Sequence, residues 1–82
     1  MVIVDFSDNF EKIAKKIKDQ TLKEKIKKQI KKIIEDPELG KPMMYSRKGT
    51  REVYISHYRL SYIYIKEQDK VVLLDLYHKD EQ

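Results

Sequence analysis

The residues best suited to chemistry lie in the second half of this 82-residue chain, in two neighbouring segments. Arg59 sits inside an apolar and aromatic run, and the pair His78-Lys79 follows a second apolar run. If both runs are strands with antiparallel pairing, Arg59 comes close to the end formed by Tyr77, His78 and Lys79. Cations fixed on a sheet are well placed to hold phosphates, because the guanidinium group suits bidentate phosphate contacts. The pattern therefore predicts a phosphate-binding site.

Cleavage of RNA is one reaction that such a site could perform. Attack of a 2′-hydroxyl on its own phosphate needs a base for the hydroxyl, cations for the crowded phosphorane and an acid for the leaving oxygen. Arg59 and Lys79 could supply the cations, and histidine, here His78, is the side chain suited to proton transfer near neutral pH. This reaction needs no metal ion and no other cofactor. Two histidines far apart in a chain without cysteine also argue against a structural zinc site.

Each candidate also has a purely structural interpretation. Arg59 could pair with Asp75 or Glu52 across the sheet. His78 could be an exposed residue at the end of a strand. Tyr77, beside the basic end, is the best candidate for stacking on a base. The other strand tyrosines are expected to be packing groups: Tyr54, Tyr58, Tyr62 and Tyr64.

The net charge of +4 is concentrated in two blocks. Residues 10–34 hold ten lysines and three acids, and residues 41–66 hold six basic residues and one acid. Such blocks suit a polyanion or an acidic protein, although the first could simply be the solvated face of helices. In the second block, Arg47, Lys48 and Arg51 are candidates for binding RNA phosphates.

The elements that position these residues follow the order β-α-α-β-β-β. Residues 2–6 read as an opening strand, and residues 8–11 and 21–24 fit capping boxes that open two amphipathic helices. Asp36-Pro37 ends the second helix, and residues 37–50 read as a loop. The last three strands are expected at about 51–55, 58–66 and 71–78. Alternation along the last one groups Val72, Leu74, Leu76 and His78 on one face.

This order predicts the α+β class: a single small domain, with a helical hairpin packed on one face of a mainly antiparallel four-stranded sheet. The other face stays partly open, and we expect the site there. The absence of cysteine excludes disulfides and thiol nucleophiles. Without a signal peptide or an apolar run of spanning length, we expect a cytoplasmic protein with no membrane partner.

Taken in order, these segments resemble the RelE/ParE superfamily of toxin–antitoxin toxins over essentially the whole chain, residues 1–82. The resemblance begins with the opening strand, followed by a helical hairpin ending near Asp36-Pro37. A loop at Gly40 then leads into the arginine-led strand at Arg51. Next comes the segment His57-Tyr-Arg-Leu-Ser-Tyr62, and His78-Lys79 follows the final apolar strand.

The resemblance implies a RelE-like mRNA interferase that cuts messages on the ribosome. It also implies a cognate RelB-like antitoxin that wraps the toxin in a hetero-oligomer. In that family, the positions of Arg59 and Lys79 contact the scissile phosphate. Thr50 and Glu52 stand where the best-known RelE toxins have lysines, and no counterpart of the late catalytic tyrosine precedes Gln82. Two alternatives remain: a ParE-like inhibitor of DNA gyrase without nuclease activity, and a degenerate member that only binds its antitoxin.

Overall fold

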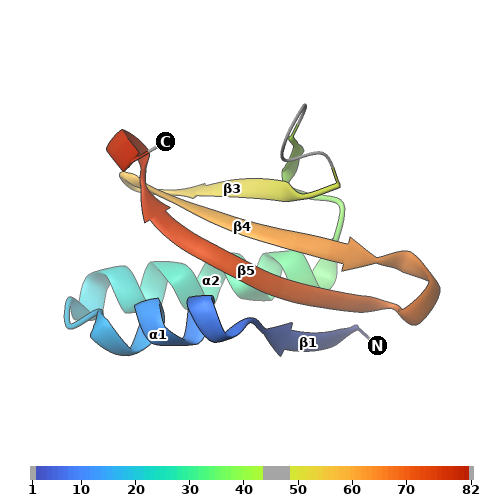
Figure 1. Ribbon diagram of the computed structural model, residues 1–82, viewed down its shortest axis with the longest axis horizontal. Helices are drawn as coiled ribbons and strands as arrows, with labels where there is room; N and C mark the ends of the chain where they lie inside the picture. Colours follow the sequence, from blue (N-terminus) through green and yellow to red (C-terminus); the bar gives the residue numbers. More distant parts are fainter. Residues whose placement is uncertain (1, 44–48, 82) are drawn as a thin grey trace.

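The computed structural model describes residues 2–43 and 49–81 and has two helices on one side of a five-stranded sheet (Figure 1). The helices are α1 (Asp8–Lys16) and α2 (Gln20–Glu35). The strands are β1 (Ile3–Phe6), β2 (Lys41–Pro42), β3 (Arg51–Ile55), β4 (Tyr58–Ile65) and β5 (Lys70–His78). Short 3₁₀ turns follow β4 and β5, at Lys66–Gln68 and Lys79–Glu81. The α+β class and the helical hairpin on one face of the sheet are as predicted.

The helix starts differ from the predicted capping boxes. The N-cap of α1 is Ser7, whose hydroxyl accepts the Phe10 N–H at 3.0 Å, so Asp8 is already helical. The N-cap of α2 is Asp19, whose carboxylate accepts the N–H groups of Thr21 and Leu22. Serine and aspartate both accept hydrogen bonds from the free N–H groups of a first helical turn. In each helix, a residue one or two positions before the predicted N-cap takes this role. The end of α2 before Pro37 was correctly predicted.

The sheet has the strand order β1-β5-β4-β3-β2, with one parallel pair, β1 with β5. The four-stranded prediction missed β2, which lies in the region expected to be a loop. Lys41 and Pro42 pair with Glu52 and Arg51 at the sheet edge. An edge strand tolerates proline because the missing N–H need not join a ladder. Within the described residues, no helix is long and apolar enough to cross a membrane.

The hydrophobic core lies between the helices and the sheet. A β-bulge in β5 determines which residues of that strand face the core. Ser61 pairs with Asp75, but the next residue, Tyr62, pairs with Leu73, which leaves Leu74 as an extra residue. The bulge reverses the alternation, so the predicted grouping of Val72 and Leu74 with Leu76 was wrong. The fully buried residues on this side instead include Leu60, Tyr62, Val71 and Leu73. The Leu74 carbonyl accepts the Ser7 hydroxyl at 2.7 Å, which ties the start of α1 to the bulge.

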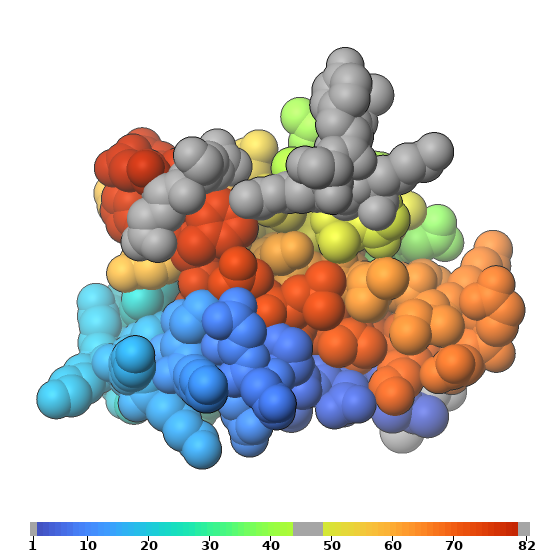
Figure 2. All heavy atoms as spheres, in the orientation of Figure 1, coloured from blue at the N-terminus to red at the C-terminus, as the bar shows by residue number. Residues whose placement is uncertain are grey.

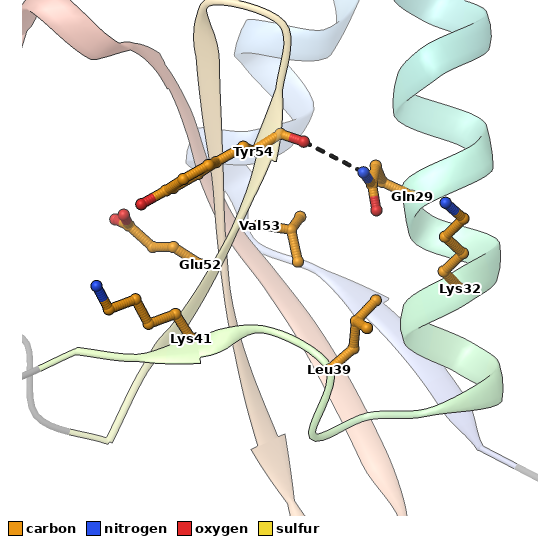
Figure 3. Close-up of a pocket in the computed structure, with 7 residues that line it drawn as sticks. All are labelled: Gln29, Lys32, Leu39, Lys41, Glu52, Val53 and Tyr54. Carbon is orange, nitrogen blue, oxygen red and sulfur yellow. Dashed lines mark hydrogen bonds between the residues drawn. The ribbon is translucent and has the colours of Figure 1, made fainter.

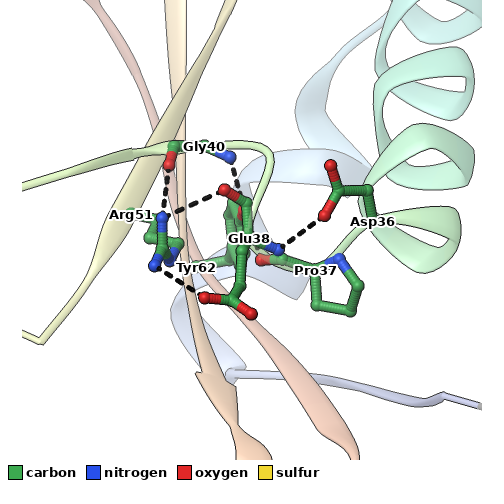
Figure 4. A network of polar contacts seen from close by, with 6 residues as sticks. All are labelled: Asp36, Pro37, Glu38, Gly40, Arg51 and Tyr62. Atoms are coloured by element: carbon green, nitrogen blue, oxygen red, sulfur yellow. Dashed lines mark hydrogen bonds and ion pairs between the residues drawn. The ribbon is translucent and has the colours of Figure 1, made fainter.

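A polar network fixes the loop between α2 and β2 (Figure 4). The buried Tyr62 hydroxyl accepts the Gly40 N–H and donates to the Pro37 carbonyl, both at 2.8 Å. Burial raises the pKa of the Tyr62 phenol, although the Gly40 N–H acts in the opposite direction. A Cβ at Gly40 would lie 2.8 Å from the Tyr62 ring, so the close approach requires glycine. The network therefore holds the chain where it enters the second basic block.

Replacing Tyr62 with phenylalanine should lower the free energy of unfolding by about 1–3 kcal/mol, because a buried N–H and a carbonyl both lose their partner. The change keeps the ring and its packing. Chemical denaturation measures the effect, and Tyr54→Phe is the matched control. Tyr54 is 57% exposed, and its change should stay within about 0.5 kcal/mol of the unsubstituted protein. Equal stability of the two variants would contradict the structural role of the Tyr62 hydroxyl.

Candidate phosphate-binding site on the open sheet face

A two-residue turn sets the position of Arg59. Ser56 has a positive φ of 56° and joins β3 to β4 with His57. This tight turn fixes the register of the hairpin. Arg59 therefore lies between Tyr54 on β3 and Tyr77 on β5, each its direct cross-strand partner. The predicted approach of Arg59 to the end of the last strand is confirmed.

Arg59 lies on the sheet face that the helices leave open. Its Cζ is 3.9 Å from the centroid of the Tyr54 ring, and Nη1 donates to the Tyr58 carbonyl at 3.3 Å. The alternative pairing with Asp75 or Glu52 does not occur: among the described residues, no ion pair of Arg59 is found. The Asp75 carboxylate instead accepts the Asn9 amide at 3.0 Å. A guanidinium oriented by a ring but not neutralised by a carboxylate can receive an anion.

Tyr77 and Glu52 form a buried pair on the same face. Tyr77 is 8% exposed and Glu52 is 3% exposed, and the tyrosine hydroxyl donates to the carboxylate. Both residues have further contacts. With only 8% of the residue exposed, little of Tyr77 is accessible for stacking on a base. The proposed stacking role of Tyr77 stays a prediction.

Tyr77→Phe should destabilise the fold by about 1.5–3 kcal/mol, the contribution typical of a hydrogen bond to a charged group. The substitution leaves a 3%-exposed carboxylate with one donor fewer. Thermal unfolding measures the loss, and adding Glu52→Gln tests its origin. A neutral amide needs the donor less than a carboxylate does, so the second change should recover part of the loss. A double variant whose losses simply add would count against the pair.

The structure separates His78 from Arg59. His78 pairs with Tyr58 and contacts its ring edge at 5.4 Å between centroids. Because Tyr58 packs against the core, the pleat places His78 on the face opposite to Arg59. The Nδ1 atom of His78 lies 3.2 Å from the Asp80 N–H and 3.4 Å from its carboxylate. A neutral ring accepts from the first, and a protonated ring donates to the second.

Lys79 is exposed in the turn after β5, and its N–H donates to the His57 carbonyl at 2.8 Å. This bond anchors Lys79 beside the β3–β4 turn, at the same end of the sheet as Arg59. The catalytic roles of His78 and Lys79 stay predictions. The placement makes proton transfer by His78 depend on a substrate that passes around the strand ends.

Of the phosphate-binding candidates in the second block, the structure describes only Arg51. Arg51 points to the helix side, where it bonds the carbonyls of Glu38 and Gly40 at 3.1 and 2.8 Å and pairs with the Glu38 carboxylate at 3.6 Å (Figure 4). Its guanidinium therefore binds the loop between α2 and β2 and does not lie on the open face. Arg47 and Lys48 lie outside the described residues. The phosphate-binding roles of all three remain predictions.

Sequence reasoning missed the part that Tyr54 plays, since this residue was expected to be a packing group. It supplies the ring on which Arg59 lies and is 57% exposed. The signal was present in the sequence: a two-residue turn at Ser56-His57 places Tyr54 opposite Arg59. The bond between Tyr77 and Glu52 had no comparable signal, because it spans three strands.

Two polar pairs lie at the other end of the sheet. The Tyr64 hydroxyl donates to the Asp69 carboxylate at 3.0 Å, and this bond raises the pKa of the phenol. Across β1 and β5, Asp5 and Lys70 pair at 3.4 Å. The orange turn after β4 and the red C-terminal residues lie at opposite ends of the molecule (Figure 2).

No group of three or more metal-binding side chains occurs among the residues described.

Comparison with known proteins agrees with this architecture. The model of the ParE toxin family of type II toxin–antitoxin systems, parDE, matches residues 4–82. The toxin–antitoxin complex RelBE of E. coli contains a chain with 22% identity and a TM-score of 0.82, and the match covers 95% of this chain and 96% of that one. For RelBE2 of Mycobacterium tuberculosis the identity is 24% and the TM-score 0.81, over 94% and 96% of the chains.

The YoeB/ParE toxin from Agrobacterium tumefaciens has 17% identity and a TM-score of 0.82, over 94% and 98% of the chains. At these identities the likeness establishes the fold. A search of curated proteins found no match. The family match and the shared fold together place the chain among the toxins of the RelE/ParE superfamily. The chain belongs to the ParE toxin family of type II toxin–antitoxin systems.

Proposed function

We propose that this toxin is a ribosome-dependent endoribonuclease that cuts messenger RNA. The observation that carries the proposal is Arg59, which lies on the open sheet face with its guanidinium on the Tyr54 ring and without a carboxylate partner among the described residues. A planar cation oriented in this way suits the phosphorane that forms when a 2′-hydroxyl attacks its phosphate. The exposed Lys79, at the same end of the sheet, supplies a second cation.

Induced expression of the toxin should arrest translation and leave messages cut within codons of the ribosomal A site. The experiment maps 5′ ends of cellular messages before and after induction and repeats the mapping with purified toxin and programmed ribosomes. Cleavage of ribosome-bound but not of free message supports the proposal. Intact messages in both settings would exclude it.

A second candidate is inhibition of DNA gyrase, as in ParE toxins. The observation that favours it is the family model, which is named for ParE. One fold hosts both activities, so the fold does not separate them. A supercoiling assay with purified gyrase and the same toxin preparation distinguishes the two. Poisoned supercoiling together with uncut message would decide for gyrase.

The proposed partner is a cognate RelB-like antitoxin, which would form a hetero-oligomer with this chain in the cytoplasm. The relatives solved as RelBE and RelBE2 are toxin–antitoxin complexes. The lysine-rich helices of this chain suit an acidic segment that folds on binding. Co-purification from the native operon at moderate and high salt tests the pairing. Recovery of this chain alone at both salt concentrations would contradict it.

A further inference from the structure

A groove runs along the junction of α2 and β3, away from the open face that carries Arg59. It consists of three hollows of about 180, 160 and 380 Å³. The first two share Lys25 and Ser56, and the last two share Lys32 and Tyr54 as well as Gln29. The hollows therefore follow one another from the β3–β4 turn to β2. Figure 3 shows the last of them, with Gln29 and Lys32 on α2 facing β3.

Among the described residues, four exposed lysines line the groove: Lys25, Lys28, Lys32 and Lys41. The three on α2 recur about one helical turn apart, so their ammonium groups form a row along the groove. The carboxylates among the lining residues that the structure describes lie at the two ends. Asp19 is occupied as the N-cap of α2, and Glu52 is buried against Tyr77. The middle of the groove is consequently cationic and suits an anionic chain.

The edge of β3 is closed to a peptide strand. Arg51 and Glu52 already pair with β2, and the Gln29 amide donates to the Tyr54 carbonyl at 3.2 Å. An acidic peptide that added itself as a strand would need these main-chain groups. The groove thus offers side-chain cations beside an edge of β3 whose main-chain groups are already engaged by β2 and Gln29, which favours a phosphate backbone over an extended acidic peptide.

Tyr54 connects the groove to the candidate site. This residue, which is 57% exposed, lines two of the three hollows, and its ring contacts the guanidinium of Arg59. A chain lying in the groove would pass Tyr54 to reach Arg59. We propose that the groove binds the phosphate backbone of single-stranded RNA and leads it around the sheet edge towards Arg59. The inference rests on the proposed RNA-directed function.

The test measures binding of a short single-stranded 2′-O-methyl RNA, which lacks the attacking hydroxyl, by fluorescence anisotropy over a range of salt concentrations. The groove variant is Lys25→Gln/Lys28→Gln/Lys32→Gln. The control variant, Lys16→Gln/Lys27→Gln/Lys31→Gln, removes the same charge from exposed lysines that do not line the groove. The groove variant should bind about tenfold or more weakly, with the slope of log affinity against log salt reduced by about 2. The control should change both values much less.

Equal losses in the two variants would overturn the inference, because net charge would then explain the binding. Unchanged RNA binding with cleavage of ribosome-bound message intact would reject the groove and leave the proposed function standing. Absence of RNA binding and of cleavage in the unsubstituted toxin would reject both. Weakened binding of the antitoxin with unchanged RNA binding would assign the groove to an acidic protein instead.

Discussion

Replacing Arg59 with alanine is expected to slow cleavage of ribosome-bound message by about 10²- to 10³-fold, the usual loss when one preorganised donor to a developing negative charge is removed. The physical reason is the position of the guanidinium, 3.9 Å above the Tyr54 ring on the open face. Single-turnover cleavage of a programmed ribosome complex measures the change. Growth after induction gives the same comparison in cells.

Arg59→Lys separates charge from geometry. Lysine keeps the positive charge but lacks the planar fork that contacts two phosphate oxygens, so this variant should recover only part of the rate. Lys66→Ala, at an exposed position beyond the far end of β4, is the control for charge. The stacking of Arg59 contributes only about 0.5–1 kcal/mol, so the alanine variant should remain folded. If the Arg59→Ala variant were as toxic as the unsubstituted protein, Arg59 would have no role in catalysis.

The placement of Arg59 could be predicted because it depends on local signals. The β-branched and aromatic runs indicate strands, and the two residues between them indicate a tight turn. The turn alone fixes which residues of β3 and β4 lie opposite each other. The approach of Arg59 to Tyr77 follows from the same register, since β5 is antiparallel to β4.

The predictions from sequence failed where contacts between distant segments, and not the local pattern, determine the structure. No residue near Leu74 signals a bulge: the carbonyl of the extra residue accepts a hydrogen bond from Ser7, the N-cap of α1, which is far away in the sequence. The same bulge reverses which residues of β5 are buried. The two-residue strand β2 has almost no pattern of its own and exists because β3 offers an edge. The hydrogen bond from Tyr77 to the buried Glu52 likewise joins residues 25 positions apart in the sequence.

The divided placement of the predicted catalytic residues has a similar origin. Arg59 and His78 are close along the strands, but neighbouring positions in a strand point to opposite faces. His78 pairs with Tyr58, so it lies on the helix side together with the Tyr58 ring. A residue next to the cross-strand partner of Arg59, such as His78, therefore points away from Arg59. The direct cross-strand partners of Arg59 lie on the same face as Arg59. This favours Tyr54 over His78 as a neighbour of the phosphate.

Ile33→Ala is expected to have the largest effect on stability, about 2–5 kcal/mol. Ile33 is completely buried, and its side chain lies between α2 and the sheet. Alanine would lose the transfer energy of three carbons and leave a cavity that the two packed layers fill only in part. The total stability of a domain of this size is on the order of 4–12 kcal/mol. Chemical denaturation should therefore show a large fraction of it lost.

Ile3→Ala is the matched control, since Ile3 is 59% exposed on the edge strand β1 and its loss should cost less than about 0.5 kcal/mol. Near-equal stability of the two variants would contradict the packing of α2 on the sheet. The Ile33 variant should also lose toxicity in cells although it touches no functional residue, because a less stable fold is degraded faster. Addition of the antitoxin should restore its abundance, as a ligand of the folded state does. Loss of toxicity therefore supports a catalytic role only where the variant unfolds like the unsubstituted protein. We expect this of Arg59→Ala.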